Sequence, residues 1–259
     1  MTAGELSLLL ELARRAALRA GPAILDVYHA AAAPDVRHKS DASPVTLADE
    51  RAEALITETL AAGAPNIPII AEEHCDRHGI PTQTPPRFWL VDPLDGTKEF
   101  LRRNGEFTVN IALVEGDRPV LGIVHVPALG LTFAGAGPGS ATRQRGTSPT
   151  AAINARPVPA SGAVVLHSRS HANEAKIAEY LATLAAPVTR VSGSAVKFCL
   201  IAAAEADLYP RFGPTMEWDT AAGQAVLEAA GGCVLTPEGA PFRYGKPGFL
   251  NDNFIARGR

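Results

Sequence analysis

Hydrophobic residues recur at helical spacing along the first stretch of the chain. Over residues 6–27, leucines and alanines return every three or four positions with glutamate and arginine between them, which predicts an amphipathic helix. This helix is interpreted as a packing element. Residues 43–46 break the pattern, and a second helix is predicted over 47–60, ended by the segment Ala-Ala-Gly-Ala-Pro. Asp49 falls in the first turn of this second helix.

Short apolar runs bounded by turn residues predict strands in both halves of the chain. In the first half they cover 67–71, 88–91, 107–115 and 120–126, and a tight turn joins the last two as a hairpin. The segment 135–149 is rich in Gly, Ser, Thr and Pro and is predicted to be a loop between two lobes. Beyond it, strand-like and helical runs alternate, so we expect layers of α and β structure. The predicted strands there are 163–167, 188–191, 206–209 and 232–235, and the predicted helices are 172–184, 195–204 and 219–230.

The composition restricts the class of protein. Of the 259 residues 46% are hydrophobic, but 46 residues are alanine, so larger apolar side chains make up only about 28% of the chain. A formal net charge of −3 excludes a chain-wide basic surface for duplex nucleic acid. No run reaches the roughly 18 apolar residues of a membrane span, and no signal peptide is evident. We expect a cytoplasmic protein without an integral membrane segment; peripheral membrane association and the choice between monomer and homodimer are left open.

The segment Asp92-Pro93-Leu94-Asp95-Gly96-Thr97 carries the strongest chemical signal. Pro93 keeps the preceding residue extended, so the strand is predicted to end in a rigid turn that aims two carboxylates at one point. Gly96 lets a ligand approach the backbone, and the helical run that begins at Thr97 offers free N–H groups to a phosphate. Carboxylates beside a phosphate site are the ligands that Mg²⁺ prefers in proteins. A solvated acidic turn is the alternative interpretation.

Further acidic residues are candidates for the same site. Glu72 and Glu73 follow a predicted strand, and strand alternation would send one toward the site and the other away from it. Asp219 is predicted to be the N-cap of a helix. The run 74–78, His-Cys-Asp-Arg-His, is interpreted as a polar loop in preference to a zinc site, because no second Cys/His pair at zinc-finger spacing accompanies it. The three cysteines are odd in number and far apart, which argues against a disulfide framework.

In this order, these motifs resemble those of the inositol monophosphatase superfamily, whose members are Mg²⁺-dependent, lithium-sensitive phosphatases. The matching segments are Asp49 after Val45-Thr46, Glu72-Glu73, residues 92–97 and Trp218-Asp219-Thr220-Ala221-Ala222-Gly223. Three more segments are similar to the CysQ-type 3′(2′),5′-bisphosphate nucleotidases within this superfamily: Lys98-Glu99-Phe100, residues 192–199 and residues 208–214.

The resemblance implies a fold and an activity. The fold is a layered αβαβα sandwich of the inositol monophosphatase and sugar phosphatase type, of class α+β or α/β. Residues 1–259 would form a single catalytic domain, with one lobe of about 1–150 that holds the main metal site and another of about 151–259 that completes it. The implied reaction removes the 3′-phosphate from 3′-phosphoadenosine 5′-phosphate, a by-product of sulfate activation.

The resemblance also implies a role for each matching residue. Two or three Mg²⁺ ions would be held by Glu72, Asp92, the backbone carbonyl of Leu94, Asp95 and Asp219. Asp49 and Thr97 would orient and deprotonate the attacking water, with Glu72 near a third ion. The expected substrate contacts are Gly96, Thr97, His171, Ser194, Lys197, Arg211 and Asp219. Lys197 and Arg211 would hold the second phosphate, and a solvated surface charge is the alternative for both. Glu73 is given a supporting role.

Two other functions stay open at this point. One is a phosphatase that acts on inositol 1-phosphate or fructose 1,6-bisphosphate, against which Lys98-Glu99-Phe100 and the two basic positions argue. The other is a non-catalytic nucleotide or metal sensor on the same scaffold, which the complete ligand set disfavours. Clustered carboxylates without a metal are expected to raise one another's pKa by repulsion. Glu217, which directly precedes Trp218, is expected to add an acid near the site.

Overall fold

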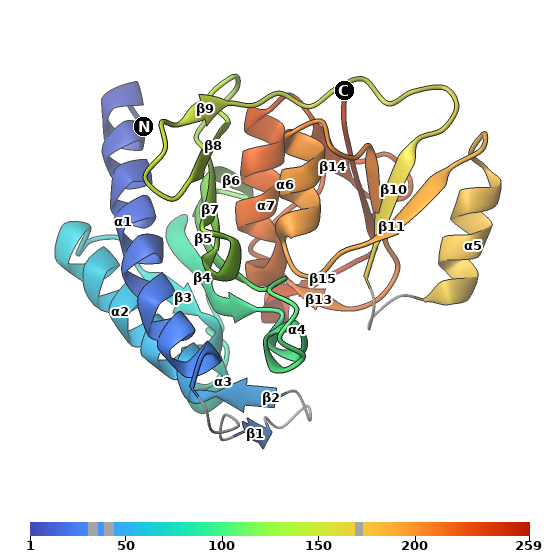
Figure 1. The fold of residues 1–259 in the computed structure, drawn as a ribbon. Helices are drawn as coiled ribbons and strands as arrows, with labels where there is room; N and C mark the ends of the chain where they lie inside the picture. The colour runs from blue at the N-terminus through green and yellow to red at the C-terminus, as the bar shows by residue number, and fades with distance from the viewer. Residues whose placement is uncertain (31–35, 39–43, 169–172) are drawn as a thin grey trace.

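Two β-sheets organise the protein, as a computed structural model that describes residues 1–30, 36–38, 44–168 and 173–259 shows (Figure 1). The larger sheet follows the chain in the order β3-β4-β5-β6-β7-β8-β9, and only its β3–β4 pair is parallel. Its strands are β3 (Ile69–Ala71), β4 (Arg87–Asp95), β5 (Thr108–Glu115), β6 (Arg118–Val126), β7 (Leu131–Gly135), β8 (Thr142–Arg145) and β9 (Ala151–Ala152).

The smaller sheet has the order β11-β10-β12-β16-β14, in which β10 pairs in parallel with β11 and β12, whereas β16 is antiparallel to both of its neighbours. Its strands are β10 (Val164–His167), β11 (Val188–Val191), β12 (Leu208–Arg211), β14 (Cys233–Leu235) and β16 (Phe254–Arg257). Two short ribbons complete the strand pairing: β1 (Val36–His38) with β2 (Pro44–Thr46), and β13 (Thr215–Met216) with β15 (Leu250–Asn251).

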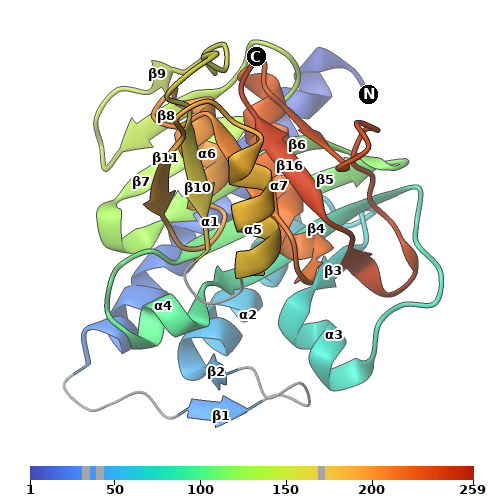
Figure 2. The same cartoon turned by 90° about the vertical axis from the view of Figure 1, so that its right-hand side faces the viewer.

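Helices cover both faces of the larger sheet and separate it from the smaller one. Helices α1 (Ala3–Tyr28) and α2 (Leu47–Gly63) lie on its outer face, and α6 (Val196–Ala202) and α7 (Glu217–Ala229) lie between the two sheets (Figure 1). Helix α5 (Glu174–Ala182) packs on the far side of the smaller sheet, which Figure 2 shows from that side. Two short helices, α3 (Glu72–His78) and α4 (Thr97–Leu101), follow strands β3 and β4. The predicted αβαβα sandwich is confirmed.

Strand β4 shows why the larger sheet is buried on both faces. Phe88 and Leu90 belong to the core shared with α7, whereas Trp89 and Val91 belong to the core shared with α1 and α2. Successive side chains of a strand point to opposite faces, so a strand covered on both sides must be apolar throughout. The continuous run Phe-Trp-Leu-Val meets that requirement, and it fixes the depth at which the acidic segment beginning at Asp92 emerges.

The predicted helices and strands are confirmed in outline, with two corrections. The segment 135–149 is not only a loop, since it contains β8, a mostly polar strand that pairs with β7. A polar strand can hold its place through the backbone ladder alone, so hydrophobic alternation does not reveal it. The polar run 74–78 is part of helix α3 and not a loop, and its imidazoles His74 and His78 stack one helical turn apart.

Among the described residues no helix is both long and apolar enough to cross a membrane. The cytoplasmic location, the choice of monomer or homodimer and the division into lobes near residue 150 stay predictions. The strands of the larger sheet all come from residues 69–152, and those of the smaller sheet all come from residues 164–257.

Candidate active site

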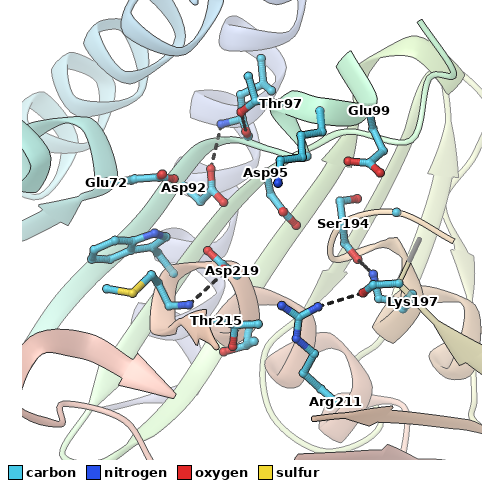
Figure 3. A pocket seen from close by; sticks show the side chains of 18 of the residues that line it. Glu72, Asp92, Asp95, Thr97, Glu99, Ser194, Lys197, Arg211, Thr215 and Asp219 are labelled. Carbon is cyan, nitrogen blue, oxygen red and sulfur yellow. Dashed lines mark hydrogen bonds between the residues drawn. The ribbon is translucent and has the colours of Figure 1, made fainter. Parts of the chain in front are cut away.

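A cavity of about 440 Å³ opens where elements from both halves of the chain meet (Figure 3). Its acidic side chains come from four elements: Glu72 begins α3, Asp92 and Asp95 lie on β4, Glu99 lies on α4, and Asp219 lies in the first turn of α7. Two of its cationic side chains, Lys197 and Arg211, lie on the opposite wall, on α6 and β12, and a third, Lys98, lies on α4. Residues far apart in the sequence therefore form one polar site.

A β-bulge brings the two aspartates of β4 to the same face. Asp92 pairs with Asn110 of β5, and Asp95, three residues later, pairs with Thr108, so two residues of β4 stand opposite one of β5. A regular strand would turn residues three apart to opposite faces, and the extra residue cancels that reversal. Pro93 has no N–H for the ladder and fits the irregular position. The predicted rigid turn is wrong, because β4 continues through the bulge to Asp95.

Three carboxylates form a cluster suited to a divalent cation. Glu72, Asp92 and Asp219 each offer an oxygen, and these oxygens lie within 4.8 Å of one another. Burial raises the pKa of Asp219 well above its ordinary value, and the charges of Asp95 and Glu72 raise it further. Mutual repulsion was expected to raise the pKa of carboxyl groups here, and it does so for Asp219, but burial is the larger cause of the rise. The donor set consists of oxygen, which fits Mg²⁺ better than a soft metal.

Asp95 lies beside this cluster and is held from both halves of the chain. Its Oδ2 accepts a hydrogen bond of 2.6 Å from the backbone N–H of Ala195, and longer ones from Asn110 Nδ2 at 3.4 Å and Thr108 Oγ1 at 3.5 Å. Burial raises its pKa to about 6, although nearby Lys197 and these hydrogen bonds lower it. One carboxylate oxygen is thus fixed by the protein, and the side chain as a whole lines the cavity.

Asp49 and Thr97 form a hydrogen-bonded pair at the edge of the cavity. Asp49 is buried at the third position of α2, where its Oδ2 accepts from the backbone N–H and hydroxyl of Thr46 at 2.8 and 2.7 Å. Its Oδ1 lies 3.4 Å from Thr97 Oγ1, which is also 3.4 Å from the carbonyl oxygen of Leu94. The threonine hydroxyl can therefore pass a proton toward a carboxylate whose orientation is fixed by a helix cap.

Gly96 shapes the transition from strand β4 to helix α4. It adopts φ 92° and ψ 43°, a left-handed conformation that suits glycine, and Thr97 begins the helix as predicted. A Cβ at this position would lie 3.1 Å from the carbonyl oxygen of Glu106 and 3.4 Å from the Cβ of Ser194. Glycine thus allows the loops of the two halves to come close together beside the cavity.

Both predicted substrate cations line the cavity, but the protein already engages them. Lys197 is 3% exposed, and its ammonium donates to the carbonyl oxygens of Ser194 at 2.7 Å and Ser192 at 3.2 Å. The guanidinium of Arg211 donates to Ser168 Oγ at 3.0 Å, and also to the carbonyl oxygens of Pro214 at 2.7 Å and Gly213 at 3.3 Å. The alternative of solvated surface charges is wrong for both residues.

Two sequence expectations are corrected here, and one lies outside the described residues. Asp219 is not the N-cap of α7 but its third residue, where its Oδ2 accepts from the N–H of Met216, the actual cap. Glu217 points away from the cavity, since it is fully buried and binds Lys246 Nζ at 2.7 Å and two backbone N–H groups. His171 lies outside the described residues. Glu73 is buried outside the cavity lining.

The sequence analysis missed several residues that build the site. Asn110 and Thr108 donate hydrogen bonds to Asp95 from the neighbouring strand β5. They could have been found by pairing the predicted strand 107–115 with the strand that carries Asp92 and Asp95. Ser168 had no sequence signal, and Ala195 lay in the matching segment 192–199 without a role of its own, because a hydrogen bond over a long sequence distance leaves no local pattern. Trp218 also lines the cavity, and its buried indole N–H has no hydrogen-bond partner among the described residues.

Comparison with known proteins agrees with this geometry. The inositol monophosphatase family model matches residues 5–258. The 3′(2′),5′-bisphosphate nucleotidase CysQ of Shigella flexneri is 45% identical over 240 residues, which is 92% of this chain and 95% of that protein. The CysQ nucleotidase of Salmonella typhimurium is 44% identical over 248 residues, covering 95% and 98% of the two chains.

Solved structures show the same fold. The crystal structure of CysQ from Bacteroides thetaiotaomicron superposes with a TM-score of 0.81 at 35% identity and covers 96% of each chain. An inositol monophosphatase from Anabaena superposes with a TM-score of 0.76 at 27% identity, covering 98% of this chain and 91% of its own.

Proposed function

Because the chain belongs to the inositol monophosphatase family, we propose that it is a Mg²⁺-dependent phosphatase that hydrolyses the 3′-phosphate of 3′-phosphoadenosine 5′-phosphate. The observation that carries this proposal is a single cavity with a carboxylate cluster on one wall and the buried guanidinium of Arg211 on the other. A bisphosphate substrate needs both walls: the carboxylates hold the cations that bind the reacting phosphate, and the cationic wall binds the phosphate that is not hydrolysed. The CysQ proteins that are similar to this chain are named 3′(2′),5′-bisphosphate nucleotidases.

The cation site is proposed to comprise Glu72, Asp92, Asp95, Asp219 and the carbonyl of Leu94. Glu72, Asp92 and Asp219 already converge, which supports the assignment. Bound Mg²⁺, as two or three ions, would neutralise phosphate charge and acidify a water molecule. The protein's own contribution is to hold oxygen ligands in place, since each preset ligand lowers the entropic cost of binding.

Thr97 and Asp49 are proposed to take the proton from the attacking water. The Thr97 hydroxyl accepts that proton while donating its own to Asp49 Oδ1, along the 3.4 Å contact between them. The water oxygen bonds to phosphorus, the bond to the ribose 3′-oxygen breaks, and that oxygen takes a proton from a solvent water molecule, while Asp49 returns its proton to solvent through Thr97. The products are AMP and inorganic phosphate, and the residues return to their starting protonation.

Arg211 and Ser194 are proposed to face the second phosphate. A guanidinium has five N–H donors, and the described contacts of Arg211 use three of them. Its remaining donors can bind a phosphate in the fork geometry that arginine favours. Gly96 and Thr97 at the start of α4 are the proposed contacts of the reacting phosphate. A contact from His171 stays a prediction.

A substrate panel tests the proposal. At millimolar Mg²⁺, the purified protein should release phosphate from 3′-phosphoadenosine 5′-phosphate with a higher kcat/KM than from inositol 1-phosphate or fructose 1,6-bisphosphate. Chelation by EDTA should abolish turnover, and added Mg²⁺ should restore it. Faster turnover of inositol 1-phosphate would reassign the enzyme to the sugar and inositol phosphatases. Phosphate release from none of the substrates would favour a non-catalytic sensor.

A further inference from the structure

The turn at residues 192–195 joins strand β11 to helix α6 and contacts the first half of the chain at two points. The N–H of Ala195 donates to Asp95 Oδ2 at 2.6 Å, and the N–H of Gly193 donates to Glu106 Oε2 at 3.1 Å. A Cβ on Gly193 would lie 2.8 Å from the carbonyl oxygen of Glu106. The turn is therefore pressed against the residues on both sides of α4, and its position decides where Asp95 points.

Ser194 gives this turn a strained backbone. Its φ is 45°, in the left-handed region that costs a non-glycine residue about 1 kcal/mol or more. Neighbouring contacts must hold such a conformation in place. The strain lies one residue before the N–H that binds Asp95, so relaxation of Ser194 would rotate that N–H away from the carboxylate.

Lys197 makes the contacts that hold this strained turn in place. Its ammonium donates to the carbonyl oxygens on both sides of Gly193, those of Ser194 at 2.7 Å and Ser192 at 3.2 Å, and lies 4.8 Å from the centre of the Tyr209 ring. The residue is 3% exposed, so losing the ammonium would leave these carbonyl oxygens without their donor in a poorly solvated place. Two of its three N–H donors are directed at the turn and not across the cavity.

We propose that Lys197 is a positioning residue, which locks the strained turn at residues 192–195 so that the N–H of Ala195 orients Asp95 toward the cation site. This role differs from the contact with the second phosphate that the sequence suggested. The kinetic part of the test rests on the proposed function, but the measurement of Mg²⁺ binding does not. Because Asp95 is the residue affected, positioning predicts a loss of activity that does not depend on the substrate's second phosphate, whereas direct contact with that phosphate predicts a loss for the bisphosphate alone.

The test compares Lys197→Met with the wild type by two measurements. The first is the Mg²⁺ concentration that gives half of the Mg²⁺-induced rise in the thermal midpoint, which reports cation binding without turnover. It should increase by about tenfold or more, as is typical when a partner that orients a ligand is lost. The second is kcat/KM for 3′-phosphoadenosine 5′-phosphate and for adenosine 3′-monophosphate, which should fall by the same factor for both.

Two outcomes would overturn the proposal. In the first, kcat/KM falls only for the bisphosphate while the Mg²⁺ midpoint stays unchanged, as direct contact with the second phosphate requires. In the second, neither measurement changes. Lys176→Met, an exposed lysine of α5, is the matched control and should match the wild type in both. If circular dichroism shows Lys197→Met to be unfolded, Lys197→Gln, which can still donate to one carbonyl, takes its place in both measurements.

A second-site variant separates positioning from simple loss of charge. Ser194→Gly removes the cost of the left-handed conformation, so Lys197→Met/Ser194→Gly should regain part of the lost Mg²⁺ affinity. Ser194→Ala removes the same hydroxyl but keeps the strain, and Lys197→Met/Ser194→Ala should regain none. Equal behaviour of the two double variants would contradict the proposed lock. If the wild type does not hydrolyse the nucleotide, the proposed function fails, but the Mg²⁺ midpoints still test this inference.

Discussion

Four aspartates of the site have one feature in common: one carboxylate oxygen of each accepts a hydrogen bond from a backbone N–H. The pairs are Asp49 with Thr46, Asp92 with Leu94, Asp95 with Ala195 and Asp219 with Met216, at 2.6 to 2.9 Å. These bonds fix each carboxylate before any ligand arrives, which reduces the reorganisation that cation binding requires. For Asp95 and Asp219 these hydrogen bonds also lower the pKa, which burial and neighbouring acids raise.

Replacement of Asp92 by asparagine should remove catalysis but preserve the fold. The amide side chain would keep an oxygen to accept the N–H of Leu94, which Asp92 Oδ1 accepts at 2.9 Å, so the bulge should remain. The negative charge at the centre of the cation site would be lost, and we expect kcat to fall by about a thousandfold or more. Phosphate release measures the effect, and far-UV circular dichroism is the control. A folded variant with near-normal kcat would exclude Asp92 from the cation site.

Thr97 tests the proton path at a single atom. Thr97→Val keeps the shape of the side chain but removes the hydroxyl that contacts Asp49, so kcat should fall by about a hundredfold with little change in KM. Thr97→Ser keeps the hydroxyl and should lose far less. Steady-state kinetics at saturating Mg²⁺ separate the two. A near-normal kcat in Thr97→Val would exclude this hydroxyl from the proton path.

At the scale of elements, the long apolar helices and strands could be predicted from periodicity, but the geometry of the site could not. The Asp-x-x-Asp spacing indicated two carboxylates, whereas the bulge that turns both to one face depends on the register with β5. Glu72 and Glu73 were expected to diverge as neighbours on a strand, but they diverge at the start of helix α3. Register and helix starts depend on tertiary pairing, which short sequence windows do not contain.

Close packing of β6 on α7 makes glycine necessary at position 122. A Cβ there would lie 2.3 Å from the carbonyl oxygen of Ala222, a backbone atom that cannot rotate away. Gly122→Ala should therefore lower the free energy of unfolding by about 2 kcal/mol or more. Urea denaturation measures it, with Gly4→Ala as control, since the Cβ would meet nothing within 4 Å at that position in α1. The control should be neutral or slightly more stable.

At the scale of the whole molecule, the buried His125 makes stability depend on pH. It lies on β6 beneath α1, where burial lowers its pKa from 6.5 to about 4 although a hydrogen bond to the carbonyl of Leu131 opposes this. Between these two values the unfolded chain takes up a proton at this residue that the folded chain does not, so the contribution of His125 to stability falls as the pH falls through this window. The expected loss is at most roughly 3 kcal/mol.

Denaturation at several pH values tests this prediction against the variant His125→Gln. The free energy of unfolding of the wild type should drop more steeply between pH 6.5 and pH 4 than that of the variant, because glutamine does not titrate. Above pH 7 the two curves should run parallel. Parallel curves through the acidic window as well would show that folding leaves the pKa of His125 unchanged.

The hydrogen bond from Ala195 to Asp95 joins a turn of the second half to a strand of the first, and it has a consequence for the life of the protein in a cell. A chain in which the two sheets have not yet come together possesses most of its acids but not the arrangement that uses them. We therefore expect phosphate-ester hydrolysis only from molecules in which the two sheets have come together.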